Sequence, residues 1–354
     1  MIRKTPLYEE HVRLNAKMVE FANFLLPIRY SSIVDEHLAV REGVGIFDVS
    51  HMGEIIVEGN NAIAFLNKLI SNNIEKIKSS RIKYSLFISE RGTIIDDFLI
   101  YCISDTKLLL VVNAINKDKD LNWLNDNKED GISIIDKSLN YAQIAIQGPK
   151  SKEIMLALTS ENNLPIKYYS FIEKALIINH QVLISKTGYT GEEGYEIYAK
   201  DNAIKDIFNT LISLGATPCG LGSRDTLRLE ASMPLYGYEM NEDISPLDTA
   251  LEHFCDNNKP NFIGKSNVYD KGLTRIGLIN LDKGIIRENM EVLYKDKIIG
   301  KTTSGTYLPY LKASYAMAII DKEYSKEETI LDVKIRNRFV KAQVVALPFY
   351  KRKK

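Results

Sequence analysis

Four short β-rich segments follow one another after Lys271, and they limit most strongly what the end of this chain can form. They read RIGLINL, EVLYKDKIIGKTT, YAMAII and ILDVKI, and turn signals separate them at regular intervals. Short strands spaced in this way are typical of a β-barrel or sandwich. We therefore predict a C-terminal β-barrel with a boundary near residue 272, preceded by a larger region that mixes helices and strands.

The region before this boundary alternates between strand and helix patterns. Three β-rich runs, YSLFIS, GTIIDDFLIYCI and LLLVVNA, are separated by turns, and helices are expected at 62–77 and 203–214. Leu14, Met18 and Phe21 recur at the spacing of one helix face, so we expect a first helix that ends before Pro27. The predicted fold class is α+β, and 354 residues exceed the usual size of one hydrophobic core.

Charge, cysteine content and hydropathy exclude several function classes. The 46 basic and 46 acidic residues cancel, so nothing in the charge favours a nucleic-acid or membrane partner. Three cysteines without CxxC spacing and five scattered histidines predict neither a disulfide framework nor a metal site. No apolar run approaches the roughly 20 residues of a membrane helix, and the N-terminus lacks a signal-peptide pattern. We expect the cytoplasm for a bacterial chain and the mitochondrial matrix for a mature eukaryotic one.

Two adjacent carboxylates, Asp96 and Asp97, interrupt the apolar run GTIIDDFLIYCI. Side chains alternate between the two faces of a strand, so at most one of the pair faces a given pocket. A carboxylate in apolar surroundings must be paired, hydrogen-bonded or shifted in pKa, as are groups that handle protons on a substrate amine. Tyr84 lies about a hairpin's length upstream and is expected beside Asp97 across the sheet. A turn at the strand edge, after Gly92, is the alternative interpretation.

The segment TGYTGEEGYE at 187–196 is predicted to be a glycine-rich turn between two strands. Its glycines could let the backbone approach a ligand, while Tyr189 supplies a ring and Glu196 a carboxylate. A carboxylate accepts two parallel hydrogen bonds from an amino-pyrimidine edge, so this segment suits a flat heteroaromatic ligand. A plain hairpin is the alternative.

The segment GLGSRDTLRLEA at 220–231 presents Arg224 and, one helical turn later, Arg228. Arginine binds carboxylates through two parallel hydrogen bonds, whereas ion pairs within the helix to Asp225 and Glu230 are the alternative. GLGSRD lacks the third glycine of a dinucleotide-binding fingerprint, so we reject that function.

An ordered series of motifs resembles the T-protein family of the glycine cleavage system. It runs from TPLYEEHVRLNAKMVEFANFLLP through GIFDVSHMGE, GTIIDDFLIY, VVNA, QGPK, TGYTGEEGYE, GLGSRDTLRLEA, NFIGK and TSGTYLP to PFY, nearly the whole chain. The resemblance implies a three-domain cloverleaf with a discontinuous first domain. The implied domains are a folate-binding domain at 1–50 and 138–245, a second α+β domain at 51–137 and 246–272, and the C-terminal β-barrel domain at 273–354. The chain departs from the family at Asn23-Phe24, where glycine and tryptophan are usual, at Leu25-Leu26 and at Leu308, where serine is common.

The resemblance implies an aminomethyltransferase of glycine catabolism and one-carbon metabolism. Such an enzyme moves the methylene carbon of the aminomethyl-dihydrolipoyl arm of H-protein to tetrahydrofolate, releases ammonia, and works with P-protein and L-protein. A scaffold does not fix the donor. A folate-dependent demethylase of the same fold and a non-catalytic folate-binding regulatory protein are therefore the alternatives.

Particular residues fall on the family's site positions. The resemblance implies that Asp97 is the catalytic carboxylate near the attacking folate nitrogen, either as a general base or as a group that positions folate electrostatically. It also implies that Arg287 lies on the substrate side. The residues expected to bind folate are Met52, Tyr84, Asn113, Tyr189, Glu196, Arg224 and Tyr350.

Overall fold

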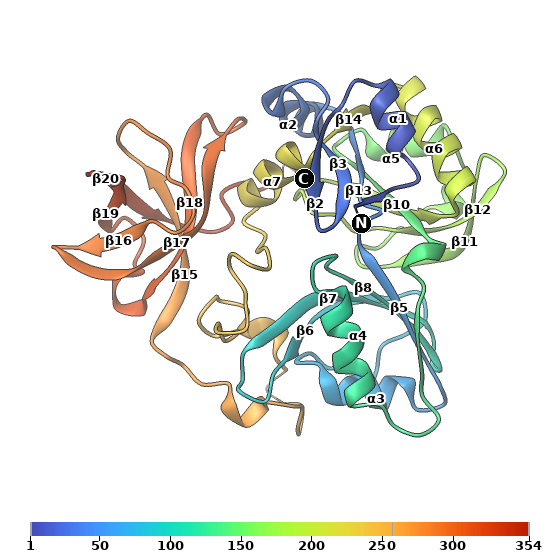
Figure 1. Ribbon diagram of the computed structural model, residues 1–354, viewed down its shortest axis with the longest axis horizontal. Helices are drawn as coiled ribbons and strands as arrows, with labels where there is room; N and C mark the ends of the chain where they lie inside the picture. The colour runs from blue at the N-terminus through green and yellow to red at the C-terminus, as the bar shows by residue number, and fades with distance from the viewer. Residues whose placement is uncertain (1, 257, 353–354) are drawn as a thin grey trace. The chain divides into compact units, whose positions relative to one another are not determined.

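The computed structural model describes residues 2–256 and 258–352, and these form two compact units (Figure 1). The α+β fold class is confirmed, whereas the predicted boundaries of three domains stay a prediction. The first unit comprises the residues up to Leu69, Asn73–Ser85 and Asp97–Arg224; the second comprises Ile70–Asn72, Leu86–Asp96 and the residues from Asp225 onward.

A six-stranded sheet organises the first unit, in the order β11-β12-β13-β10-β4-β14. All its neighbouring strands are antiparallel except β14 and β4, which are parallel. The strands are β4 (Gly45–Asp48), β10 (Ala142–Gln147), β11 (Phe171–Ile177), β12 (His180–Ser185), β13 (Gly194–Ala199) and β14 (Thr217–Cys219). The helices beside it are α1 (Tyr8–Arg13), α2 (Ile33–Glu42), α5 (Ser151–Leu156), α6 (Asp201–Ser213) and α7 (Leu221–Glu230), of which α7 continues into the second unit.

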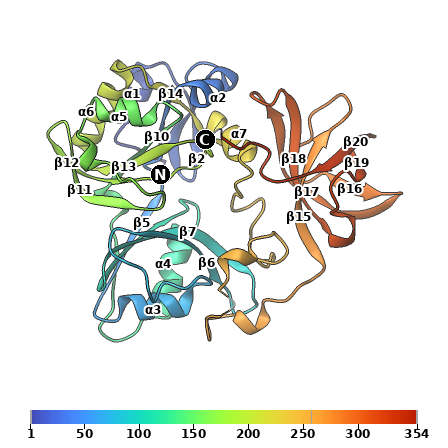
Figure 2. The ribbon, with the colours of Figure 1, turned by 180° about the vertical axis from the view of Figure 1, so that it is seen from behind.

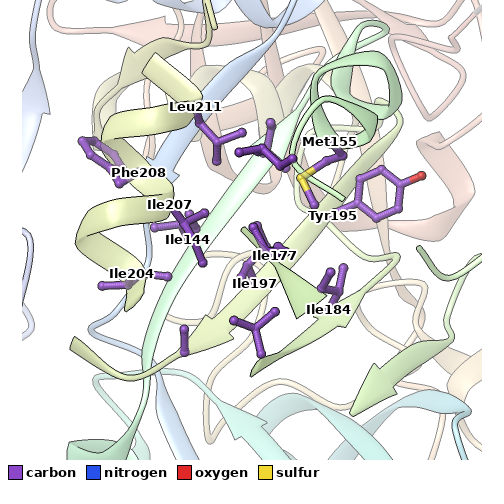
Figure 3. Close-up of a cluster of buried hydrophobic side chains, with 14 of the residues drawn as sticks. Ile144, Met155, Ile177, Ile184, Tyr195, Ile197, Ile204, Ile207, Phe208 and Leu211 are labelled. Atoms are coloured by element: carbon purple, nitrogen blue, oxygen red, sulfur yellow. The ribbon is translucent and has the colours of Figure 1, made fainter. Parts of the chain in front are cut away.

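The hydrophobic core of the first unit lies on one face of this sheet. Helix α6 buries Ile204, Ile207 and Leu211, which lie three to seven residues apart on one face of the helix. These side chains join residues of β10 and β13 in one cluster, and Figure 3 shows Ile207 and Ile144 within it. Burial of each large apolar side chain stabilises the fold by about 1.5–3 kcal/mol. Because side chains alternate along a strand, the residues of β10 and β13 between these apolar positions point to the opposite face, which carries polar side chains.

The first helix is shorter than the sequence indicated. Helix α1 ends at Arg13, and Asn15 has a left-handed φ of 56° that no helix continues. The predicted helical residues 17–21 form strand β2 (Lys17–Phe21), which pairs with β3 (Phe24–Arg29) and, through β3, with β1 (Arg3–Lys4). The spacing of three apolar residues was therefore misread as one helix face.

Several departures from the family pattern find local explanations. Asn23 has φ 64°, a conformation that asparagine tolerates better than most residues, in the tight turn between β2 and β3. Leu308 is completely buried against Leu229 and Met317.

A five-stranded sheet carries the Asp96-Asp97 pair, in the order β6-β7-β8-β5-β9. Figure 2 labels three of its strands, β5, β6 and β7. Its strands are β5 (Gly53–Glu58), β6 (Ile82–Ile88), β7 (Ile94–Ser104), β8 (Lys107–Val112) and β9 (Ser133–Asp136), with helices α3 (Ala62–Leu69) and α4 (Lys117–Asp126). The three predicted β-rich runs are confirmed as β6, β7 and β8. Helix α3 stops at Leu69 rather than near Ile77, because Ile70 pairs with Phe87 and the Asn67 side chain accepts a hydrogen bond from Ile74 N.

The predicted C-terminal β-barrel is confirmed in the second unit. Six strands close in the order β15-β18-β17-β16-β19-β20 around an apolar interior. The strands are β15 (Leu273–Asn280), β16 (Glu291–Tyr294), β17 (Lys297–Leu308), β18 (Ala313–Asp321), β19 (Ile330–Ile335) and β20 (Arg338–Val345). Closure leaves no unpaired sheet edge.

Candidate active site

Asp97 is held by hydrogen bonds from both neighbouring strands. The hydroxyl of Tyr84, on β6, donates to Asp97 Oδ2 at 2.9 Å, which confirms the predicted contact across the sheet. Asn113, just after β8, donates through Nδ2 to Asp97 Oδ1 at 2.8 Å and to the Asp97 carbonyl at 3.0 Å. Asp97 is half-buried, whereas Asp96 is completely buried. A carboxylate fixed at both oxygens is oriented in advance for contact with a substrate.

Tyr84 keeps its proton and so remains a hydrogen-bond donor to Asp97. Burial raises the pKa of Tyr84 well above its ordinary value, and the nearby Asp97 charge raises it further. The phenol is therefore protonated throughout the physiological range.

Met52 lies just before strand β5, which is the neighbour of β8 in the same sheet. It directly precedes Gly53, the first residue of β5, which pairs with Val112 at the end of β8. Its partly buried side chain packs against a cluster that includes Tyr101 and Tyr198. The role of Met52 as a wall of the folate site stays a prediction.

Glu196 is buried in the middle of β13, on a strand that is apolar on its other face. Thr187 Oγ1 donates to Oε2 at 2.5 Å, and Gln143 Nε2 donates to Oε1 at 3.3 Å. Burial raises the pKa of Glu196 above its ordinary value, although Thr187, Arg224 and Gln143 each act to lower it. Each carboxylate oxygen has a further lone pair, so Glu196 can still accept hydrogen bonds from a ligand.

Arg224 and Tyr189 form a second pair near Glu196. The guanidinium carbon of Arg224 lies 4.9 Å from the centre of the Tyr189 ring, within the range of a cation–π contact. Burial lowers the pKa of Arg224, while Glu196 and Tyr189 oppose that change. Arginine stays charged even so, and it can bind an acidic group.

The glycines near Tyr189 have a different role from the predicted one. A Cβ at Gly188 or Gly194 would lie 2.0 Å or 2.3 Å from the side-chain amide of Gln147. Gln147 is completely buried and donates to the Thr187 carbonyl at 3.1 Å. These two glycines therefore make room for a glutamine of the chain itself rather than for a ligand.

Arg228 has a structural role, as the alternative interpretation allowed. It is buried and forms ion pairs with Asp225 at 2.8 Å and with Glu239 at 3.1 Å. It also donates to Ser304 Oγ at 2.8 Å. These contacts satisfy its charge inside the second unit.

Tyr169 is a site residue that the sequence did not single out. It has a left-handed φ of 57°, and its backbone bonds both to Ile82 and to Lys186. The charges of Glu196 and Asp97 both contribute to raising its pKa, after burial and Tyr168. Tyr169 therefore lies within electrostatic range of both carboxylates. A non-glycine residue held in this conformation marks a constrained position, but nothing in the sequence announces it.

His51 was also missed as part of this region. It is 6% exposed, and its Nδ1 has no hydrogen-bond partner among the residues that the structure describes. It lines a pocket of about 500 Å³ with Met52 and Ala114. Burial, followed by the charge of Arg224, lowers the pKa of His51 to about 4. The imidazole is neutral at physiological pH.

Two predicted site residues belong to the second unit. Exposed Arg287 donates to Thr306 Oγ1 at 2.9 Å beside the barrel strands. The backbone of Tyr350 donates to the Glu230 carbonyl at 2.9 Å, and its ring meets Tyr310 edge-on. Their participation in the site around Asp97 stays a prediction.

Comparison with known proteins identifies the family. Residues 7–259 match the family described as GCVT N-terminal domain, and residues 274–351 match the glycine cleavage T-protein C-terminal barrel domain. The chain belongs to the glycine cleavage T-protein family. Its relatives in that family include the aminomethyltransferase of Thermosipho melanesiensis, 44% identical over 99% of this chain and 98% of the relative. The aminomethyltransferase of Bacillus subtilis is 41% identical over 99% of this chain and 100% of the relative.

A solved structure of the T-protein family has the same fold. The crystal structure of the glycine cleavage system aminomethyltransferase T from Bartonella henselae superposes with a TM-score of 0.91 at 28% identity, covering 99% of each chain. The predicted membership of this enzyme family is thereby confirmed. Among residues 2–256 and 258–352, no helix is long and apolar enough to cross a membrane.

Proposed function

We propose that this T-protein family member transfers the methylene carbon of an aminomethyl-dihydrolipoyl arm, carried by H-protein, to tetrahydrofolate. The observation that supports this proposal best is the Asp97 carboxylate, fixed by Tyr84 and Asn113. The charges of both Asp97 and Glu196 act on the pKa of Tyr169, which supports their placement in one site. The site thus offers one oriented carboxylate for a reacting amine and a second one for recognition of a heteroaromatic edge.

The bonds of the proposed reaction balance without an oxidant or reductant. The carbon leaves both the lipoyl sulfur and its own amine nitrogen, and it becomes bonded to two amine nitrogens of folate. The two protons lost from those folate nitrogens end on the sulfur, giving the thiol, and on the leaving amine, giving ammonia. Asp97 accepts a hydrogen bond from the attacking folate nitrogen and stabilises the positive charge that develops there.

The residues around Glu196 suit the recognition of folate. The Glu196 carboxylate accepts hydrogen bonds from the amino-pyrimidine edge of the pterin, and the Tyr189 ring offers an apolar face. Arg224 carries a charge that complements the acidic glutamyl end. Met52 completes an apolar wall.

P-protein and L-protein act with H-protein in the same system. The bacterial relatives favour the cytoplasm as its location.

A reconstituted assay tests the donor and the acceptor together. Lipoylated H-protein charged with the aminomethyl group is mixed with tetrahydrofolate and the protein, and ammonia and methylenetetrahydrofolate are measured. We expect equal amounts of both products. Methyltetrahydrofolate formed from a methylated sulfur or amine donor, without ammonia from H-protein, would instead assign the protein to the folate-dependent demethylases. Folate binding without any transfer would indicate a regulatory protein.

A further inference from the structure

Six buried side chains form a closed ring of hydrogen bonds around Glu196. None is more than 7% exposed, and they come from β7, β10, β12, β13 and the residue two positions after β12. The members of this hydroxyl ring are Tyr101, Gln143, Ser185, Thr187, Glu196 and Tyr198. Such a ring fixes a carboxylate more firmly than separate contacts, because each hydrogen bond polarises the next.

One side of the hydroxyl ring runs through the amide of Gln143. Its Nε2 donates to Glu196 Oε1 at 3.3 Å and to the Tyr198 hydroxyl at 3.0 Å. The Tyr198 hydroxyl in turn lies 2.7 Å from the Tyr101 hydroxyl. Figure 3 shows the neighbouring Tyr195 and Ile197 in the apolar cluster, so Glu196 and Tyr198 share the opposite, polar face of β13.

The other side returns to Glu196 through three hydroxyls. Tyr101 donates to Ser185 Oγ at 3.2 Å. Ser185 Oγ lies 2.6 Å from Thr187 Oγ1, which donates to Glu196 Oε2 at 2.5 Å. Every hydroxyl in the ring thus has two neighbours.

Counting protons fixes the direction of these bonds. A hydroxyl has one proton to donate. Thr187 gives its proton to Glu196, so Ser185 must donate to Thr187. Tyr101 gives its proton to Ser185, so Tyr198 must donate to Tyr101. The series of hydrogen bonds begins at the Gln143 amide N–H, which can only donate. Every donor in the series therefore points toward the Glu196 carboxylate.

A protonated Glu196 does not fit this arrangement. If Glu196 carried a proton on Oε2, the Thr187 hydroxyl would have to accept it. Every hydrogen bond from Thr187 through Ser185 and Tyr101 to Tyr198 would then have to reverse its donor and acceptor. With the Gln143 amide oriented as it is, Tyr198 would face its nitrogen, which accepts no hydrogen bond. The ring therefore favours the ionised carboxylate, against the cost of burying its charge.

The hydroxyl ring also reaches the strand that carries Asp97. Tyr101 and Asp97 are four residues apart on β7, so both side chains lie on the same face of that strand. The ionisable groups that act on Glu196 or feel its charge are Arg224, Tyr169, Tyr101 and Tyr198. Arg224 is the cation among them, and it supports the same ionised state.

We propose that the hydroxyl ring is a positioning device, which holds Glu196 as an oriented carboxylate and thereby sets the affinity for the amino-pyrimidine edge of folate. Tyr101 and Thr187 are its key positioning residues. This inference rests on the proposed function, because the ligand edge is that of folate. The ionisation of Glu196, however, can be measured without any ligand.

Two variants open the ring while preserving side-chain shape. Tyr101→Phe removes a hydroxyl that lies three hydrogen bonds away from Glu196. Thr187→Val removes the hydroxyl that donates to Glu196 directly. Isothermal calorimetry with tetrahydrofolate, in reducing buffer, is run from pH 5 to pH 9. We expect about tenfold weaker binding for Thr187→Val and a smaller loss of affinity for Tyr101→Phe. As the pH is lowered, both variants should begin to lose binding at a higher pH than the wild type does. Thr187→Ser should restore the wild-type values.

A matched control separates this role from general packing. Tyr195→Phe removes a hydroxyl from the adjacent residue of β13, whose ring lies in the apolar cluster, and it should leave affinity and pH profile unchanged. Unchanged binding in both Tyr101→Phe and Thr187→Val would overturn the proposal.

A ligand-free measurement distinguishes failure of this inference from failure of the proposed function. Protein labelled with ¹³C at the glutamate carboxyl carbons is titrated by NMR, and Glu196→Gln identifies the Glu196 signal. We expect an ionised Glu196 at neutral pH in the wild type and a higher pKa in Thr187→Val. A protonated Glu196 in the wild type, or an identical titration in the variant, contradicts the hydroxyl ring even if folate binds. If the titration is as expected but tetrahydrofolate does not bind, the proposed function fails instead.

Discussion

The hydroxyl of Tyr84 donates a 2.9 Å hydrogen bond to Asp97 Oδ2, across neighbouring strands of one sheet. Asn113 holds the other carboxylate oxygen from the opposite side. Asp97 is thus oriented by two side chains before any substrate arrives, which is how a carboxylate reaches a reacting nitrogen with little reorganisation.

Removal of the Tyr84 hydroxyl should slow the reaction without abolishing it. A hydrogen bond to a charged group contributes about 1.5–3 kcal/mol, and Asn113 still holds the carboxylate in Tyr84→Phe. We expect kcat to fall about tenfold in steady-state assays with charged H-protein. Tyr195→Phe, in the apolar cluster, serves as the control. An unchanged kcat in Tyr84→Phe would show that this hydrogen bond does not position Asp97.

Loss of the Glu196 carboxylate should act on binding. Glu196→Ala leaves the pterin edge without its acceptor, which costs about 1–3 kcal/mol and weakens tetrahydrofolate binding by about 10- to 100-fold. Calorimetry measures this directly. Glu173→Ala, at an exposed position of β11, should bind as the wild type does. Equal affinity in Glu196→Ala and the wild type would remove Glu196 from the folate site.

His51 should make stability depend on pH in a defined window. Its pKa is lowered to about 4, first by burial and then by Arg224, whereas an unfolded histidine titrates near 6.5. Between these values the unfolded state binds more protons, so stability falls as pH falls from about 6.5 to about 4. The loss is on the order of 3 kcal/mol.

Two measurements check the His51 prediction. NMR titration of the five histidines, with His51→Gln to identify the signal, should show one imidazole that stays neutral below pH 5. The midpoint of thermal unfolding should depend less steeply on pH in His51→Gln than in the wild type. A His51 signal that titrates near pH 6.5 would contradict the burial of this side chain.

Local patterns made part of this site predictable. The period of two along GTIIDDFLIYCI separates Asp96 from Asp97, and one hairpin places Tyr84 beside Asp97. The regular spacing of turns likewise indicated the C-terminal barrel. Both inferences need only neighbouring strands, whose pairing follows from short connections.

Other features depend on long-range contacts that no local pattern contains. Tyr101 meets Ser185, and Gln143 meets Tyr198, only because strands far apart in the sequence pack together, so the hydroxyl ring was not predicted. Met18 and Phe21 are apolar at a helical spacing, yet they lie in a strand because the left-handed conformation of Asn15 ends helical geometry before them. The predicted ligand-binding role of Gly188 and Gly194 differs from the observed one for the same reason. Gln147, the residue for which they make room, is remote from them in sequence.

The turnover of Asp97→Asn with lipoylated H-protein and tetrahydrofolate tests the central claim most directly. Asparagine keeps the size of the side chain but cannot carry the charge or take a proton, and such groups contribute about 10²–10⁴ to rate. We predict a kcat at least about 100-fold lower, measured as ammonia and methylenetetrahydrofolate formed, with tetrahydrofolate affinity close to that of the wild type. A wild-type rate in Asp97→Asn would contradict the role assigned to Asp97 and, with it, the proposed mechanism.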